Sequence, residues 1–328
     1  MKRGLVEAVG ANRGVYEARL ERLRERLRSE DMRVALIYGD TYRSDDIAHL
    51  TNLCIYWNEG VVAVPADGPP VFLAKLSKRV HPWMRRTSVI EDLRASQKLP
   101  ELIGTYLHEV GPGGVGLVDR AWWPAQLVDG ITGAATDRAF ADLPDAVWSA
   151  RLVPDELDRA DLAHAGGGCA AGIAAASDAS GTTAQRLAAL ELAARGLGAR
   201  DVVAFCRDLG PGVQIECAVQ FANVWAYGAR PAGDGDTARA AFASVAPAIT
   251  AGATASDIQA AAGTDATVSV VSHCDLATGG ELRREDSRPL LAGEAVSVAV
   301  RVGAALMADT YLLDGKGATA ITRAEVSA

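Results

Sequence analysis

The chain has 328 residues, 49% hydrophobic and 23% charged, so its composition excludes a disordered polymer and supplies enough apolar side chains for two domains. Its 33 Lys and Arg against 41 Asp and Glu give a net charge of -8, which argues against nucleic acid and anionic lipid as partners. No secretory leader and no uncharged apolar run of about 18 residues is found, so we expect a cytoplasmic protein without a membrane span. Five scattered cysteines without a CxxC pair predict reduced thiols, not disulfides or a zinc ribbon.

The first half predicts a small α/β domain over residues 1–145. Leu20, Leu23 and Leu27 recur at helical spacing among charged residues, and a buried-strand pattern follows at 34–38. Two short strands flank the turn at 67–70, and "GGVGLVD" predicts another strand.

A predicted helix start marks the domain boundary. The segment "LPDAVWSARLVPDELDRADLAHA" places Pro154 at the start of a helix, with acidic residues in the first turn, where they suit the helix dipole. We therefore expect a second domain over residues 146–328.

The second half contains a weak internal repeat. "GTTAQRLAAL" from Gly181 and "GATASDIQAA" from Gly252 share Gly, Thr and Ala in register, and each opens a predicted helix. The alternative is chance similarity between alanine-rich helices. "ATVSVVSHCDL", "EAVSVAVRVG" and "ADTYLLDG" predict later strands, so we expect a sheet-rich α/β core with helices packed on it.

One predicted strand carries an acid among apolar residues. In "VQIECAVQFANVWAYGARP", Glu216 lies between Ile215 and Cys217. If the chain reverses near 221–223, Glu216 and Tyr227 come opposite each other on paired strands and point into one cavity. No strong hairpin dipeptide stands there, so one unusually long strand is the alternative.

The order of elements resembles a known family. "RLERLRERL", "DDIAHLTNL", "DGPPVFL" and "ARLVPDELDRADLAHA" resemble the amino-terminal domain and linker helix of the creatinase, prolidase and aminopeptidase P family, with "LTN" at 50–52 and "RLV" at 151–153 as the sharpest matches. The resemblance implies a creatinase-like α/β domain followed by a pseudo-symmetric pita-bread domain, with which the internal repeat agrees.

The resemblance also implies five metal-ligand positions, two Asp, one His and two Glu. They fall on residues that lack most of the donors: Glu216, Tyr227, His273, Ala299 and Ala308. A catalytic zinc needs at least three protein ligands, and hard cations need several oxygen donors. "ARDVVAFCRDLGPGVQIE" is also too short for the glycine loop and the substrate-contacting His that the peptidases carry there. We therefore expect no metal and no other cofactor.

Creatinase, as the resemblance implies, keeps the fold without metal and cleaves a C-N bond by acid-base chemistry. The corresponding roles here are His273 as general acid or base, Glu216 as its partner or as the holder of a cationic group, and Tyr227 as a hydrogen-bond donor. Structural alternatives are a salt bridge of Glu216 to Arg230 or Arg301, a core Tyr227 and a structural His273.

Further predicted substrate contacts are less specific. Arg230 and Arg301 suit a substrate carboxylate or a structural ion pair, and Asp309 neighbours a lost ligand position. Tyr56 and Trp57 belong to a segment that covers the site in relatives, often from the partner subunit, which predicts a homodimer.

Three functions stay open. The first is a metal-independent hydrolase or lyase that acts on a small polar metabolite, at a C-N bond. The second is a catalytically inactive relative that binds a ligand or partner, and the third is a residual metallopeptidase. No P-loop, no GxGxxG after a strand and no HExxH is present.

Overall fold

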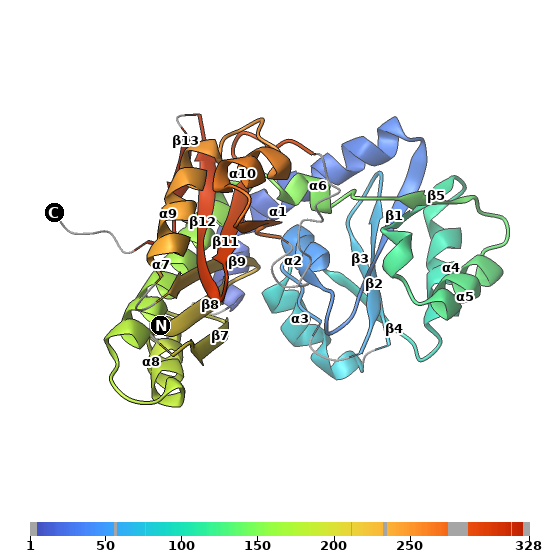
Figure 1. The fold of residues 1–328 in the computed structure, drawn as a ribbon. Helices are drawn as coiled ribbons and strands as arrows, with labels where there is room; N and C mark the ends of the chain where they lie inside the picture. Colours follow the sequence, from blue (N-terminus) through green and yellow to red (C-terminus); the bar gives the residue numbers. More distant parts are fainter. Residues whose placement is uncertain are drawn as a thin grey trace. The chain divides into compact units, whose positions relative to one another are not determined.

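The computed structural model describes residues 5–55, 58–75, 77–210, 212–231, 235–274, 288–315 and 317–323. The chain divides into two compact units, Lys2–Arg151 and Leu152–Ala328 (Figure 1). The two units are described separately below. Among the described helices, none combines the length and the apolar character that a membrane span requires.

The amino-terminal unit is a six-stranded sheet with helices on both faces. Its strand order is β4-β3-β2-β1-β5-β6; β1 is antiparallel to β2 and parallel to β5. The elements are α1 Leu5–Ser29, β1 Met32–Gly39, α2 Asp45–Thr51, β2 Gly60–Pro65, β3 Val71–Ala74, α3 His81–Thr87, β4 Asp92–Ala95, α4 Leu99–Val110, β5 Gly114–Val118, α5 Ala125–Ala134, β6 Phe140–Leu143 and α6 Trp148–Arg151, with short 3-10 turns at Lys78–Val80 and Arg120–Trp122.

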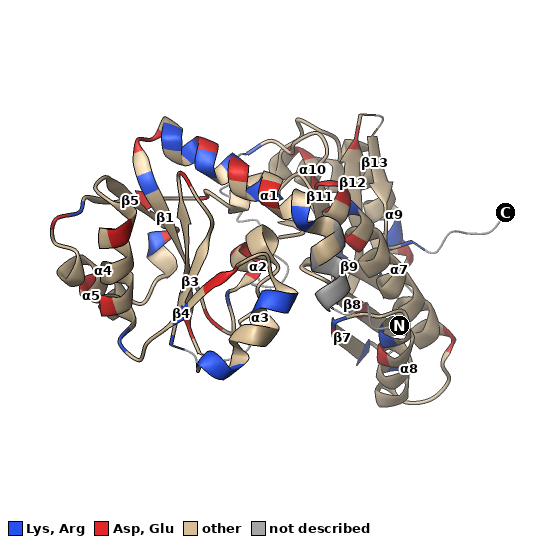
Figure 2. Cartoon of the chain, turned by 180° about the vertical axis from the view of Figure 1, so that it is seen from behind, with Lys and Arg blue, Asp and Glu red and all other residues tan. Residues whose placement is uncertain are grey.

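The predicted leucine stripe forms the buried side of α1. Leu20, Leu23 and Leu27 are at most 3% exposed, because their helical spacing directs them to the sheet. Charged residues of both signs alternate with other residues along the described part of this helix (Figure 2). The predicted strand at 34–38 lies within β1.

The two sharpest sequence matches have structural roles. Asn52 of the LTN motif ends α2 in the left-handed conformation, with φ of 58°, and its side-chain amide donates to the Thr87 carbonyl at 3.0 Å. Arg151, first residue of the RLV motif, is buried and donates to Asp46 Oδ1 at 2.6 Å. The Asn52 contact satisfies the backbone carbonyl of Thr87, and the Arg151 contact gives a buried charge its partner. In both cases the partner is distant in the sequence.

The carboxy-terminal unit is a curved sheet of antiparallel strands with helices on one face. The strand order is β10-β11-β12-β9-β8-β7, with β13 paired to β12. The elements are α7 Glu156–Asp178, α8 Thr183–Gly196, β7 Asp201–Asp208, β8 Val213–Phe221, β9 Val224–Pro231, α9 Asp236–Val245, α10 Ala255–Ala262, β10 Thr267–Ser272, β11 Ala295–Val302, β12 Ala305–Asp314 and β13 Gly317–Ala320, with a 3-10 turn at Ala246–Ala248.

The internal repeat corresponds to two similar halves of this unit. Helices α7 and α8 contact β7, β8 and β9, and α9 and α10 contact β10, β11 and β12 (Figure 1). Thr182 caps α8 and Thr254 caps α10, each through a capping box closed by the residue three positions later. The repeat in the sequence aligns Thr183 with Thr254. The capping residue of the first half is Thr182, one position earlier. The fold is the predicted pita-bread arrangement.

The segment around Glu216 is a hairpin and not one long strand. Phe221 pairs with Val224, and Ala222 takes a positive φ of 49° in the two-residue loop. Strands β8 and β9 therefore run side by side, as the reversal at 221–223 predicts. Because neighbouring residues alternate between faces, Cys217 and Val219 pack towards α7 and α8, while Glu216 points to the other face. The first side is called the helix face below, and the second the Glu216 face.

Candidate functional site

Four positions on neighbouring strands form one row on the Glu216 face. Glu216 in β8 is the register partner of Ala229 in β9, Ala229 of Ala308 in β12, and Ala308 of Ala299 in β11. Directly opposed residues point to the same face of a sheet. The row thus contains three of the five positions to which the family resemblance assigns metal ligands, at 216, 299 and 308.

Glu216 is held by two side chains on adjacent strands. It is 8% exposed; Arg207 in β7 donates to Oε1 in a very short ion pair, and the Tyr227 hydroxyl donates to Oε2 at 3.2 Å. The sequence suggested Arg230 or Arg301 as its salt-bridge partner, which is wrong: the partner is Arg207. Arg207 comes within reach because β7 pairs with β8 with Phe205 opposite Glu216, which places Arg207 diagonally beside the acid.

Tyr227 lies over the row of alanines. It packs against the apolar cluster of Ala229, Leu306 and Ala308, so the phenol ring fills space beside position 308, to which the resemblance assigns a metal ligand. Burial raises the pKa of Tyr227 well above its usual range; the neighbouring Glu216 raises it further, while the positive charge of Arg301 lowers it. The phenol is therefore neutral at physiological pH and serves Glu216 as a hydrogen-bond donor.

A side-chain bridge fixes the backbone of Tyr227. Strands β9 and β12 share a single register pair, and beyond it the Thr310 hydroxyl accepts from Tyr227 N at 2.7 Å and lies 2.9 Å from Tyr227 O. Ser297 Oγ lies 2.7 Å from the same hydroxyl. Thr310 thus replaces a missing ladder contact and sets the position of the phenol. Sequence reasoning missed Arg207 and Thr310, because both act through strand register.

His273 follows the end of β10 and is 3% exposed. Its Nδ1 lies 3.2 Å from the Ala295 carbonyl oxygen and 3.9 Å from Cys274 Sγ. A carbonyl oxygen can only accept, so Nδ1 carries a proton and Nε2 is the basic nitrogen of the neutral ring. Strands β11, β12 and β9 separate β10 from β8. The structure joins Glu216 and Tyr227 directly, whereas the contacts described for His273 are with Ala295 and Cys274.

Arg230 and Asp309 lie on the helix face and bind each other. Arg230 neighbours Ala229 in β9, and its guanidinium donates to Asp309 Oδ1 at 2.5 Å and to the Ala308 carbonyl at 2.6 Å. Asp309 is fully buried and also accepts from Thr322 at 2.8 Å and from Arg323 at 2.7 Å. These two predicted contact residues are thus brought together, on the face opposite to Glu216.

Arg301 lies on the Glu216 face, since it is two residues along β11 from Ala299. Within the described ranges its guanidinium makes no hydrogen bond or ion pair, and its charge acts on the Tyr227 phenol. Among the described residues it is a cation on this face that an anion is able to bind. Tyr56 and Trp57, the other predicted contact residues, lie outside the described residues.

The donors on the Glu216 face do not fit a dinuclear metal centre. Of the positions to which the resemblance assigns metal ligands, 299 and 308 are alanines in the row, and 227 carries a neutral phenol beside it. Glu216 is already bonded to Arg207 and Tyr227. Among the residues that the structure describes, no group of three or more His, Cys, Asp or Glu is arranged to hold a metal ion. The side chains present therefore disagree with the metal content that the fold family implies.

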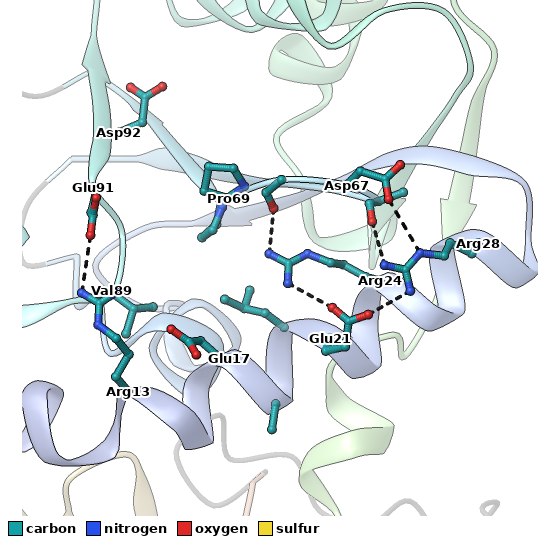
Figure 3. A pocket seen from close by; sticks show the side chains of 15 residues that line it. Arg13, Glu17, Glu21, Arg24, Arg28, Asp67, Pro69, Val89, Glu91 and Asp92 are labelled. Carbon is teal, nitrogen blue, oxygen red and sulfur yellow. Dashed lines mark hydrogen bonds and ion pairs between the residues drawn. The ribbon is translucent and has the colours of Figure 1, made fainter.

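An open groove of about 1080 Å³ lies in the amino-terminal unit, along α1 and the β2–β3 turn (Figure 3). Its arginines are used internally. Arg24 and Arg28 both bind Glu21, at 3.2 and 2.9 Å, and Arg13 lies 3.6 Å from Glu91. These exposed pairs satisfy one another, so the groove has the character of a solvated packing surface.

Comparison with solved structures identifies the fold. The X-Pro aminopeptidase of Thermotoga maritima superposes with a TM-score of 0.78 at 15% identity, over 93% of this chain and 97% of that chain. The prolidase of Pyrococcus horikoshii gives 0.74 at 12% identity, over 94% and 99%. The N-terminal domain of a FACT complex subunit from Eremothecium gossypii gives 0.63 at 15% identity, over 94% and 95%.

By sequence, no family profile and no curated protein matches the chain. The structural likeness extends over nearly the whole chain and establishes the fold that aminopeptidase P and prolidase share. The chain is a divergent example of this fold, because the side chains at the positions to which the resemblance assigns metal ligands differ from a metal-binding set.

Proposed function

We propose that the chain is a metal-independent hydrolase or lyase that acts on a small polar metabolite, at a C-N bond, by acid-base chemistry. The observation that carries the proposal is the hydrogen bond from the Tyr227 phenol to the buried carboxylate of Glu216, at the place of the lost ligands. Glu216 and Tyr227 stay in contact although their neighbours in the row are alanines. Such a buried polar pair is better suited to ligand binding and proton transfer than to packing.

Each group has a distinct role in this proposal. Glu216 accepts a proton from the attacking water or from the substrate carbon, and Tyr227 orients its Oε2. His273 acts as the imidazolium, which carries a proton on Nε2 as well as on Nδ1, and gives the Nε2 proton to the leaving nitrogen. The proton that Glu216 takes up returns to His273 through solvent, so both groups regain their starting states and the proton count balances. Arg207 holds the other carboxylate oxygen, Oε1, in an ion pair.

Arg301 gives the substrate a direction. Its guanidinium lies on the same face with no protein partner in the described ranges, and a guanidinium binds a carboxylate through two parallel hydrogen bonds. We therefore expect a substrate with a carboxylate at one end and the scissile C-N bond near Glu216. Arg230 and Asp309 bind each other, so in this proposal they stabilise the fold and do not contact the substrate.

The test is a substrate screen with matched variants. Small amides, ureas and guanidino acids are scored for product formation and for ligand-induced thermal shift. Glu216→Gln and His273→Ala should each lower turnover by roughly 10²- to 10⁴-fold, since each removes a proton-transfer group. Arg301→Gln should mainly raise KM. Glu191→Gln and His164→Ala, which alter side chains on helices α8 and α7, are the controls.

Two outcomes contradict the proposal. If a substrate is found and the Glu216 and His273 variants turn it over at the wild-type rate, the site is misplaced. If ligands bind through Arg301 and no product forms, the chain is a binding protein. That second candidate is favoured by the mutual bonding of Glu216, Arg207 and Tyr227, which leaves the acid engaged, and by the likeness to a FACT complex subunit domain.

A further inference from the structure

A second hollow opens on the helix face of the carboxy-terminal sheet. It measures about 550 Å³ and lies between β9, β12, α9 and the residues that follow β13. Three arginines and four apolar residues line it: Arg230, Arg239, Arg323, Phe242, Ala243, Ala246 and Met307. Because Arg230 neighbours Ala229, the register partner of Glu216, this hollow is on the opposite side of the sheet from the proposed reaction site.

Among the described residues, positive charge exceeds negative charge in the walls of this hollow. Arg230 and Arg323 share one carboxylate, that of Asp309, with contacts of 2.5 and 2.7 Å. Arg239 is engaged elsewhere, since its Nη1 lies 2.8 Å from Asp236 and its Nη2 donates to the Pro231 carbonyl at 2.6 Å. Two guanidiniums that share a single buried acid leave about one unit of positive charge facing the hollow.

One of these cations keeps unused donors. Arg323 donates from Nε to Asp309 Oδ2, and its Nη2 lies 3.3 Å from the Tyr311 hydroxyl. Its Nη1 makes no hydrogen bond within the described ranges. Its side chain is 50% exposed, so the free donors are accessible. A guanidinium fixed by a buried carboxylate is a preorganised anion site, because little side-chain freedom is lost on binding.

Apolar side chains form the other wall. The Arg323 guanidinium lies 5.9 Å from the centroid of the Phe242 ring, and Ala243, Ala246 and Met307 complete this side. An inorganic anion would leave this apolar surface wet, whereas an organic anion would cover it. We propose that the hollow binds a small organic carboxylate, with its charge on Arg323 and its apolar part against Phe242 and Met307.

The test uses 3-phenylpropanoate as probe and isothermal titration calorimetry of the full chain as readout. The carboxylate should bind, and 3-phenylpropylamine, with the same apolar part and the opposite charge, should not. Ala243→Glu places a negative charge in the hollow and leaves the Asp309 contacts in place. It should lower the affinity for the probe at least about tenfold. Arg323→Gln should do the same by removing donors.

Matched controls separate the site from general charge effects. Thr237→Glu adds the same charge to an exposed position of α9 outside the hollow, and Arg195→Gln removes an exposed arginine from α8. Both should bind the probe as the wild type does. The proposal is overturned if the wild type does not bind the probe at about 10 mM, on the order of the weakest useful affinities. It is also overturned if Ala243→Glu binds the probe as tightly as the wild type does. The third contrary outcome is competition by inorganic phosphate at equal concentration. Turnover at the Glu216 face is not part of this readout.

Discussion

The Tyr227 hydroxyl donates to Glu216 Oε2 at 3.2 Å across a two-residue hairpin, although the two residues are 11 apart in the sequence. The contact is diagonal, since the register partners are Glu216 with Ala229 and Tyr227 with Ala218. A long aromatic side chain spans this diagonal, whereas a shorter residue would not. The phenol thereby supplies bulk and a hydrogen bond at the position to which the family resemblance assigns a second acid.

Tyr227→Phe should lower the free energy of unfolding by about 1.5 to 3 kcal/mol, because one hydrogen bond to a buried, ion-paired carboxylate is lost and the ring stays. On the proposed function, it should also cost about tenfold in turnover. Urea unfolding measures the first effect, and Tyr42→Phe, at a side chain that is 90% exposed, is the control. Equal stability of both variants would show that the hydrogen bond contributes nothing.

Asp309→Asn should destabilise the protein by about 3 kcal/mol. Asp309 is fully buried and neutralises Arg230 and Arg323, so an amide in its place leaves two cations without their acid. Asp236→Asn is the matched control, since that carboxylate is 94% exposed and pairs with one arginine. Its effect should stay within about 0.5 kcal/mol. Similar thermal midpoints for the two variants would contradict the structural role of Asp309.

Metal should neither copurify in stoichiometric amount nor stabilise the fold. Any ion that binds only the native state raises its thermal midpoint, so added Zn²⁺ or Mn²⁺ should leave the midpoint unchanged, as should a chelator. The reason is the donor set at 216, 227, 299 and 308, with its two alanines and neutral phenol. Elemental analysis that finds one ion per chain would overturn this expectation.

Asp119→Asn should become more stabilising as the pH rises. Burial raises the pKa of Asp119 to about 6; the backbone N–H of Asp145 acts in the opposite direction, and nearby acids such as Asp46 raise the pKa further. An acid with a raised folded-state pKa favours folding below its unfolded value, near 3.8, and loses that contribution as the pH passes about 6. Asparagine keeps the acceptor oxygen and tolerates the positive φ of 49°.

The comparison is the difference in thermal midpoint between Asp119→Asn and the wild type at pH 4 and at pH 8. We expect that difference to grow towards pH 8. Asp129→Asn, at an exposed position of α5, should show no such trend. A constant difference would mean that Asp119 titrates alike in the folded and unfolded chain.

The homodimer that the family resemblance implies is testable by light scattering. At micromolar concentration we expect about twice the 34.2 kDa of one chain. A mass near that of one chain would contradict the prediction.

Much of the fold could be predicted from the sequence because its signals are local. The stripe of Leu20, Leu23 and Leu27, the acids at the start of α7 and the alternation in β10 and β11 act through spacing within one element, so they hold before any packing is known. The substitutions at 227, 299 and 308 are likewise read directly from residue identity. They settle which donors the chain possesses.

The partners of those donors depended on the tertiary structure. Strand order and register placed Arg207, and not Arg230 or Arg301, beside Glu216. The alternation of faces put Arg230 and Asp309 on the far side, where they bind each other. Register changes by one residue turn a side chain to the other face, and nothing local in a strand sequence fixes it. Sequence thus determined which chemical groups this protein carries, and only packing between distant strands decided which of them meet.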